Sequence, residues 1–288
     1  MLVIFTLLIE ILILKVSKKM KKYFSVFLCV NTLLLIISCG GKNTPAENNL
    51  KFDIVKYEKH LEGCDSLRED YCAKIRIEFP KITSFENEVV KEKINKSIAN
   101  FFSQDILGGT KSDDFETQMN LFIEEYESFM TEFPEAFQSW FLERTGEVKL
   151  NKANIFSIDY LDYSFTGGAH PSTFVTFKNF NLSNGEEIKL DEIIPSDKKN
   201  DLTTIAEAEF RKLKNLTAEA DLGQAGFWFE NNKFYLNDNF LIDDSSLVFY
   251  YNSYEITAYA FGPTELEIPY SKIKDLLGEN SLLRGLIE

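Results

Sequence analysis

The 288 residues of the chain, of which 44% are hydrophobic and 14% aromatic, suffice for the core of one large domain or two small ones and exclude a disordered or fibrous chain. The first 38 residues contain five Lys and one Glu, which leaves 26 basic and 44 acidic residues in the remainder. The resulting net charge of −18 beyond residue 38 excludes nucleic acid as a partner and favours a basic one, unless the charge serves solubility alone.

An export signal is predicted at the N-terminus. The basic cluster Lys18-Lys19-Met20-Lys21-Lys22 precedes an apolar run at 23–37. A basic segment followed by an apolar one is typical of a signal peptide, which we place at residues 1–38. Residues 1–16 are also apolar, but they contain Glu10 and are shorter than the roughly 20 residues that span a bilayer. We therefore hypothesise that translation starts at Met20.

The end of this signal, Leu35-Ile36-Ile37-Ser38-Cys39, resembles a bacterial lipobox. The resemblance implies that Cys39 is acylated, with palmitate among the attached chains, and becomes the mature N-terminus. Residues 39–50 then form a flexible polar tether. An uncleaved membrane anchor is the alternative. We expect a lipid-anchored protein of the bacterial envelope; Gly40 is compatible with the outer membrane, but the sequence leaves the membrane face open.

Two cysteines, Cys64 and Cys72, lie in the body of the chain. Pairing of cysteines is expected in an oxidising envelope compartment and not in the cytosol. We predict a Cys64–Cys72 disulfide that bridges two adjacent strands.

The first half of the body is predicted to consist of strands followed by helices. Period-two alternation predicts strands at 52–57 and 73–79, the second of which Pro80 ends. Apolar residues at helical spacing predict a helix at 85–102, capped near Ser84, and another at 113–133. A further strand is predicted at 140–150.

The second half returns to strands, with one long helix among them. We predict strands at 155–165 and 172–182, a short strand at 187–190, a helix at 197–216, strands at 227–235, 240–251, 255–260 and 266–269, and a last helix at 271–277. This order favours an α+β fold of two subdomains, in which a largely antiparallel sheet packs against three to four helices.

The loop between the two central strands carries a family resemblance. The run Tyr163-Ser164-Phe165-Thr166-Gly167-Gly168-Ala169-His170, with Asn179-Phe180-Asn181-Leu182 and later Phe249-Tyr250-Tyr251-Asn252, resembles the extracellular C-terminal domain of the RsiV-type anti-sigma factors. The preceding strands and helices resemble the companion domain of PdaC-type peptidoglycan deacetylases. We therefore divide the body into a PdaC-like subdomain at 51–150 and an RsiV-like domain at 151–288.

The resemblance implies binding more than catalysis. RsiV-type domains bind lysozyme, and PdaC-type proteins carry these domains beside a separate catalytic module. The candidates for a binding loop and its aromatic neighbours are Gly167, Gly168, Ala169, His170, Tyr163 and Tyr259. The alternative is a tight strand connection in which the imidazole bonds a backbone group.

Catalysis has few candidate residues. His60 and His170 are the two histidines, and their spacing does not suit a zinc site, which commonly takes three protein ligands. We expect neither a metal nor another cofactor. Three hypotheses remain: a lipid-anchored domain that binds a basic protein such as lysozyme, a module that binds cell-wall peptidoglycan, or a hydrolase in which His170 is a base beside Asp159, Asp162 or Ser172.

Overall fold

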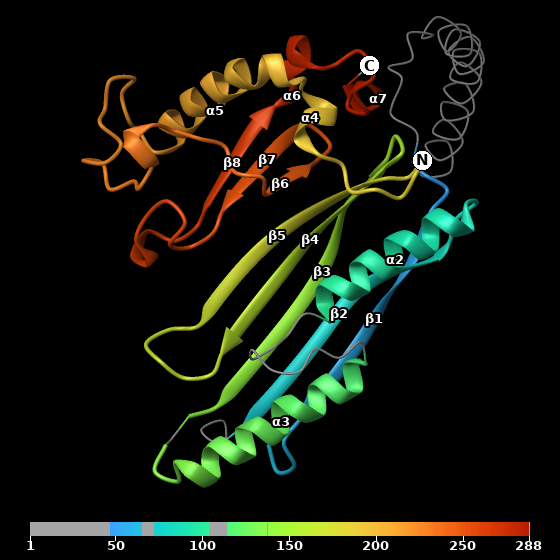
Figure 1. Cartoon of the computed structure of the whole chain (residues 1–288), viewed down its shortest axis with the longest axis vertical. Helices are drawn as coiled ribbons and strands as arrows, with labels where there is room; N and C mark the ends of the chain where they lie inside the picture. The colour runs from blue at the N-terminus through green and yellow to red at the C-terminus, as the bar shows by residue number, and fades with distance from the viewer. Residues whose placement is uncertain (1–46, 65–71, 104–113, 137, 288) are drawn as a thin grey trace, which may run out of the picture. The chain divides into compact units, whose positions relative to one another are not determined.

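The computed structural model describes residues 47–64, 72–103, 114–136 and 138–287 (Figure 1). The predicted signal peptide, Cys39 and most of the tether lie outside these residues. Residues 45–288 belong to one compact unit. In the described ranges, no helix has the length and the apolar character needed to cross a membrane.

A five-stranded sheet forms the first part of this unit (Figure 1). Its strands follow one another in sequence order: β1 (Lys51–His60), β2 (Ala73–Ser84), β3 (Trp140–Lys152), β4 (Ile155–Phe165) and β5 (Ser172–Asn181). Neighbouring strands are antiparallel except β2 and β3, which are parallel because the helices that connect them return the chain to the same end of the sheet.

Two amphipathic helices, α2 (Glu88–Phe102) and α3 (Phe115–Glu132), cover one face of this sheet (Figure 1). Their apolar residues meet the even-numbered side chains of β4, among them Phe156 and Tyr160, in one buried cluster. Aromatic rings dominate the contact: the ring of Phe102 lies 4.7 Å from that of Phe79 and 5.2 Å from that of Tyr160. The aromatic residues at helical spacing in these two helices are therefore core residues.

Two predicted details of this region are wrong. Helix α2 is capped by Asn87, whose side chain accepts from the backbone N–H of Val90, and not by Ser84, which is the last residue of β2. Pro80 does not end β2, which continues to Ser84. The pairing of β2 with β3 stops at Glu78, so the missing N–H of Pro80 removes no hydrogen bond to β3.

The predicted disulfide is confirmed. Cys64 follows β1 and Cys72 directly precedes β2, and their sulfur atoms are bonded. The backbone N–H of Leu61 also donates to the carbonyl of Ala73 at 2.9 Å. The disulfide therefore links β1 and β2 at the end of the antiparallel pair where His60 lies opposite Lys74.

The second part is a three-stranded antiparallel sheet with its own helices. The elements are α4 (Leu190–Ile193), α5 (Lys199–Leu213), β6 (Phe240–Ile242), β7 (Ser246–Tyr251), β8 (Thr264–Pro269), α6 (Tyr270–Ile273) and α7 (Arg284–Ile287). Leu202, Ala206 and Phe210 of α5 pack on the sheet in a second buried cluster. The α+β class, with largely antiparallel sheet in two subdomains, is confirmed.

Three predicted strands of this part are wrong. Residues 227–235 form a loop with a short 3₁₀ helix, Glu230–Asn232, because Phe229 and Phe234 pack against Phe210 without joining a sheet. Residues 255–260 form a turn that enters a second 3₁₀ helix, Tyr259–Phe261. The predicted strand at 187–190 is reduced to one bridge, between Phe180 and Glu187, and α4 begins at Leu190. The strand predicted at 240–251 is the hairpin of β6 and β7.

Asparagine side chains occupy the free edge of β5. Asn239 accepts from the N–H of Phe177 and donates to the carbonyl of Val175, while Asn252 bonds both the N–H and the carbonyl of Val175. Asn179, which is 2% exposed, donates to the carbonyl of Phe240 and accepts from the N–H of Ile242. These bonds join β5 to the second sheet without a strand ladder.

The five-stranded sheet continues beyond residue 150. β3 runs to Lys152, and β4 and β5 follow it in the same sheet. The boundary predicted between residues 150 and 151 therefore falls within one sheet, and the division at 51–150 and 151–288 remains a prediction.

Candidate functional site

The loop between β4 and β5 places His170 at the surface. Gly167 and Gly168 have φ values of 107° and 102°, which favour glycine. A Cβ at Gly167 would also lie 2.4 Å from the side-chain oxygen of Gln138. The backbone angles therefore favour glycine at both positions, and at Gly167 a larger residue would also have to displace the side-chain end of Gln138.

His170 stacks on an aromatic residue from the distant segment between β7 and β8. Its ring centroid lies 3.7 Å from that of Tyr259, with 12° between the planes. Its Nε2 is 3.1 Å from the hydroxyl of Tyr254, and its Nδ1 is 3.0 Å from the carbonyl of Pro171. The structure thus brings together two of the predicted binding residues, His170 and Tyr259, and adds Tyr254.

We use the name aromatic surface for His170, Tyr254 and Tyr259, whose rings lie beside one another, and for Phe261, which ends the same 3₁₀ helix as Tyr259. The exposed fraction of Phe261 is 73% and that of Tyr254 is 54%. Tyr254 also has a φ of 67°, which is rare for an aromatic residue. No periodic pattern marks Tyr254, since it lies in a turn. Tyr259, which was predicted to lie in a strand at 255–260, begins a 3₁₀ helix that ends at Phe261.

The other predicted members of the site contribute less. Tyr163 lies in β4 opposite Thr173 of β5 and is half-buried. Gly168 and Ala169 are exposed at the tip of the loop. These residues shape the loop but make none of the ring contacts that hold His170 in place.

The two segments that build the aromatic surface contain few charged residues. In the two segments that build it, 166–174 and 252–263, Glu255 is the one acidic residue and there is no Lys or Arg. Its carboxylate accepts from Asn237 Nδ2 at 2.7 Å and from the N–H of Asn252 at 2.8 Å. The carboxylate of Glu255 is thus hydrogen-bonded to neighbouring residues of its own segment and of the preceding loop.

His170 is paired with neither of the two carboxylates considered for a hydrolase. Asp162 pairs with Arg144, with 2.8 Å between Oδ2 and Nε, and Asp159 pairs with Lys149 at 3.0 Å. Burial raises the pKa of Asp159, and its hydrogen bond with Lys149 opposes that effect. The ring nitrogens of His170 face Pro171 and Tyr254 and neither carboxylate. Among the described residues, no group of three or more His, Cys, Asp or Glu side chains could hold a metal ion.

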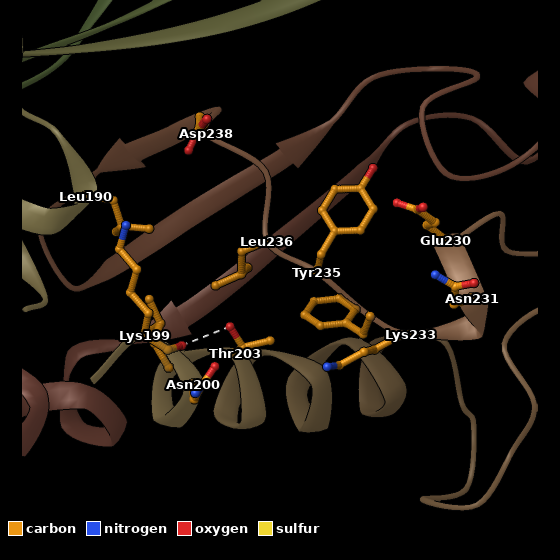
Figure 2. Close-up of a pocket in the computed structure, with 12 residues that line it drawn as sticks. Leu190, Lys199, Asn200, Thr203, Glu230, Asn231, Lys233, Tyr235, Leu236 and Asp238 are labelled. Carbon is orange, nitrogen blue, oxygen red and sulfur yellow. Dashed lines mark hydrogen bonds between the residues drawn. The ribbon is translucent and has the colours of Figure 1, made fainter. Parts of the chain in front are cut away.

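A separate cavity of about 480 Å³ lies beside α5 (Figure 2). It is bordered by α5 on one side and by the segment 230–238 on the other. Lys199 and Lys233 supply positive charge, and Glu230 and Asp238 supply negative charge. The sequence offered no signal for this cavity, because its lining comes from a helix and a loop that was predicted to be a strand.

Comparison with known families gives the class of each part. Residues 67–173 match the family model described as deacetylase PdaC, and residues 191–271 match the model described as a protein of unknown function, DUF3298. The chain therefore contains a PdaC-like domain followed by a DUF3298 domain. The aromatic surface combines a loop from the first match with a turn from the second.

Individual relatives match either part of the chain or most of it. Over 125 residues the chain is 27% identical to the peptidoglycan-N-acetylmuramic acid deacetylase PdaC of Bacillus subtilis (strain 168). The matched residues make up 43% of this chain and 26% of the deacetylase. A crystal structure of a DUF3298 family member from Bacteroides fragilis NCTC 9343 has a TM-score of 0.66 and 26% identity, and covers 85% of this chain and 99% of that chain. Another, from Pseudomonas aeruginosa PAO1, has a TM-score of 0.55 over 81% and 97% of the two chains; at 18% identity it shows the shared fold alone.

Proposed function

We propose that the chain is a lipid-anchored protein of the bacterial envelope that binds cell-wall glycan through the aromatic surface. The observation that carries the proposal is the convergence of aromatic rings from two distant segments, with His170 stacked on Tyr259 and Tyr254 beside both. Aromatic faces combine apolar area with few rotatable bonds, which suits stacking on the apolar faces of sugar rings.

The comparisons support a cell-wall-related role. The relative with 27% identity is named for a peptidoglycan-directed activity, and residues 67–173 match the family model described as deacetylase PdaC. This chain spans 26% of that relative, so the proposal concerns binding and not deacetylation. The proposed lipid anchor is inferred from the lipobox-like sequence that ends at Cys39.

The test is calorimetric titration of the purified full chain with a peptide-free oligomer of N-acetylglucosamine. We expect binding that Tyr254→Ala and Phe261→Ala each weaken about tenfold, which corresponds to about 1.4 kcal/mol. Phe133→Ala is the matched control, since Phe133 is 49% exposed but lies at the end of α3. Equal affinity of the wild type and both surface variants would refute the proposed site.

A basic protein such as lysozyme is the second candidate ligand. It is favoured by the net charge of −18 beyond residue 38 and by the resemblance to RsiV-type domains. Association driven by charge weakens strongly with salt, because the Debye length is about 10 Å at 0.1 M ionic strength. Titration with hen lysozyme at low and moderate salt distinguishes the candidates, since glycan binding by uncharged rings is expected to change little.

A further inference from the structure

A groove beside α5 has the features of a second binding site. The cavity of about 480 Å³ in Figure 2 adjoins another of about 500 Å³. Leu190, Lys199 and Asp238 line both cavities, so the two form one elongated groove. Each volume falls in the range of small-molecule sites.

Charged groups lie at both ends of the first cavity, with apolar side chains between them. Figure 2 shows Lys199 and Asp238 toward the start of α5, and Glu230 and Lys233 toward the loop at 230–233. Leu236 lies between the two ends. Within the part of the chain that the structure describes, no salt bridge involves any of these four charged groups.

This distribution restricts the ligand. A phosphate or other simple anion would meet Glu230 and Asp238 as well as the two lysines, and a simple cation would meet the lysines. A ligand with opposite charges at its two ends can meet a group of opposite sign at each end, beside one of like sign, with apolar contacts between them.

We propose that the groove binds a short peptide with free ends, with its carboxylate at Lys199 and its ammonium group at Glu230. Lys199 belongs to the first turn of α5, where the helix dipole also favours negative charge. At the other end, Tyr235 lies between Glu230 and Leu236 in Figure 2 and can donate its hydroxyl proton. Burial raises the pKa of Tyr235, with smaller contributions from Glu255 and Glu230, so the phenol keeps its proton at neutral pH.

Trialanine tests the proposal by calorimetric titration of the full chain, beside its N-acetylated and C-amidated forms. We expect each blocked form to bind about tenfold more weakly than the free peptide. Lys199→Gln should abolish the preference for the free acid over the amide, and Glu230→Gln the preference for the free amine over the acetylated form. Each variant should leave the other preference intact, which a merely structural effect would not do.

Matched controls lie close by. Lys212→Gln removes an exposed charge from α5, and Glu219→Gln removes one from the loop that follows it. Both should keep the wild-type preferences, as should Tyr254→Ala, which separates this site from the aromatic surface. Absence of trialanine binding, equal affinity for blocked and free peptides, or unchanged preferences in Lys199→Gln and Glu230→Gln would each overturn the proposal.

Discussion

At the scale of single residues, His170 separates the binding and catalytic hypotheses. Its ring stacks on Tyr259 through a flat face, so its shape matters to the aromatic surface more than its protons do. We expect His170→Phe to retain glycan affinity within about threefold, because the ring contact survives, and His170→Ala to lose about tenfold, or about 1.4 kcal/mol. Titration with the N-acetylglucosamine oligomer measures both. Equal, complete loss in both variants would favour a chemical role for the imidazole.

Asn179 provides a second test at this scale. Asn179→Ala removes two hydrogen bonds and leaves the carbonyl of Phe240 and the N–H of Ile242 unpaired beside a buried side chain. We expect the free energy of unfolding to fall by about 2 to 3 kcal/mol, measured by urea denaturation. The exposed Asn280→Ala is the control and should change stability by less than about 0.5 kcal/mol. A similar loss in both variants would show that the edge bonds are not the cause.

The candidate site could be predicted from the sequence only in part. The paired glycines and His170 stand out as a loop between two strand patterns, and the structure places His170 at the surface, with Nδ1 3.0 Å from the carbonyl of Pro171. The stacking on Tyr259 joins residues 89 positions apart, and no local pattern encodes that contact. Tyr254 was missed for the same reason, since turns lack the periodicity that marks strands and helices.

At the scale of elements, prediction succeeded where one face of an element is buried. β4 was predicted with its observed bounds, and α2, α3 and α5 within a few residues, because alternation or helical spacing reflects burial on one side. The segment 227–235 was predicted to be a strand and is rich in aromatic residues, yet its buried rings fill the core from a loop in which Asn231 and Asn232 have positive φ values. Aromatic content therefore indicated burial in this segment but not the backbone conformation.

The disulfide gives a prediction about the β1–β2 pair. Cys64 and Cys72 are separated by 8 positions, so the bond closes a short loop. Replacing both by Ser should lower the free energy of unfolding by about 2.5 kcal/mol, because the loop gains freedom in the unfolded chain. Denaturant titration measures the change, and addition of a reductant to the wild type should reproduce it. An unchanged midpoint in both experiments would contradict the expected stabilisation.

At the scale of the whole molecule, the predicted anchor determines where the binding surfaces act. Cys39→Ser should move the protein from the membrane fraction to the soluble fraction, because the predicted acylation site is lost. Fractionation followed by immunoblotting measures the distribution, with Cys29→Ser as the control because Cys29 lies inside the predicted signal peptide. Retention of Cys39→Ser in the membrane would favour the uncleaved anchor.

The asparagine contacts along β5 also limit how copies of this protein can associate. A sheet with two open edges can add strands from further copies at both ends and grow without limit. Here the amides of Val175 and Phe177 are already bonded to Asn252 and Asn239, so β1 is the remaining edge of the five-stranded sheet. A pair of copies joined edge to edge through β1 would leave no free edge on the joined sheet. Edge-to-edge pairing through β1 is therefore expected to stop at a dimer.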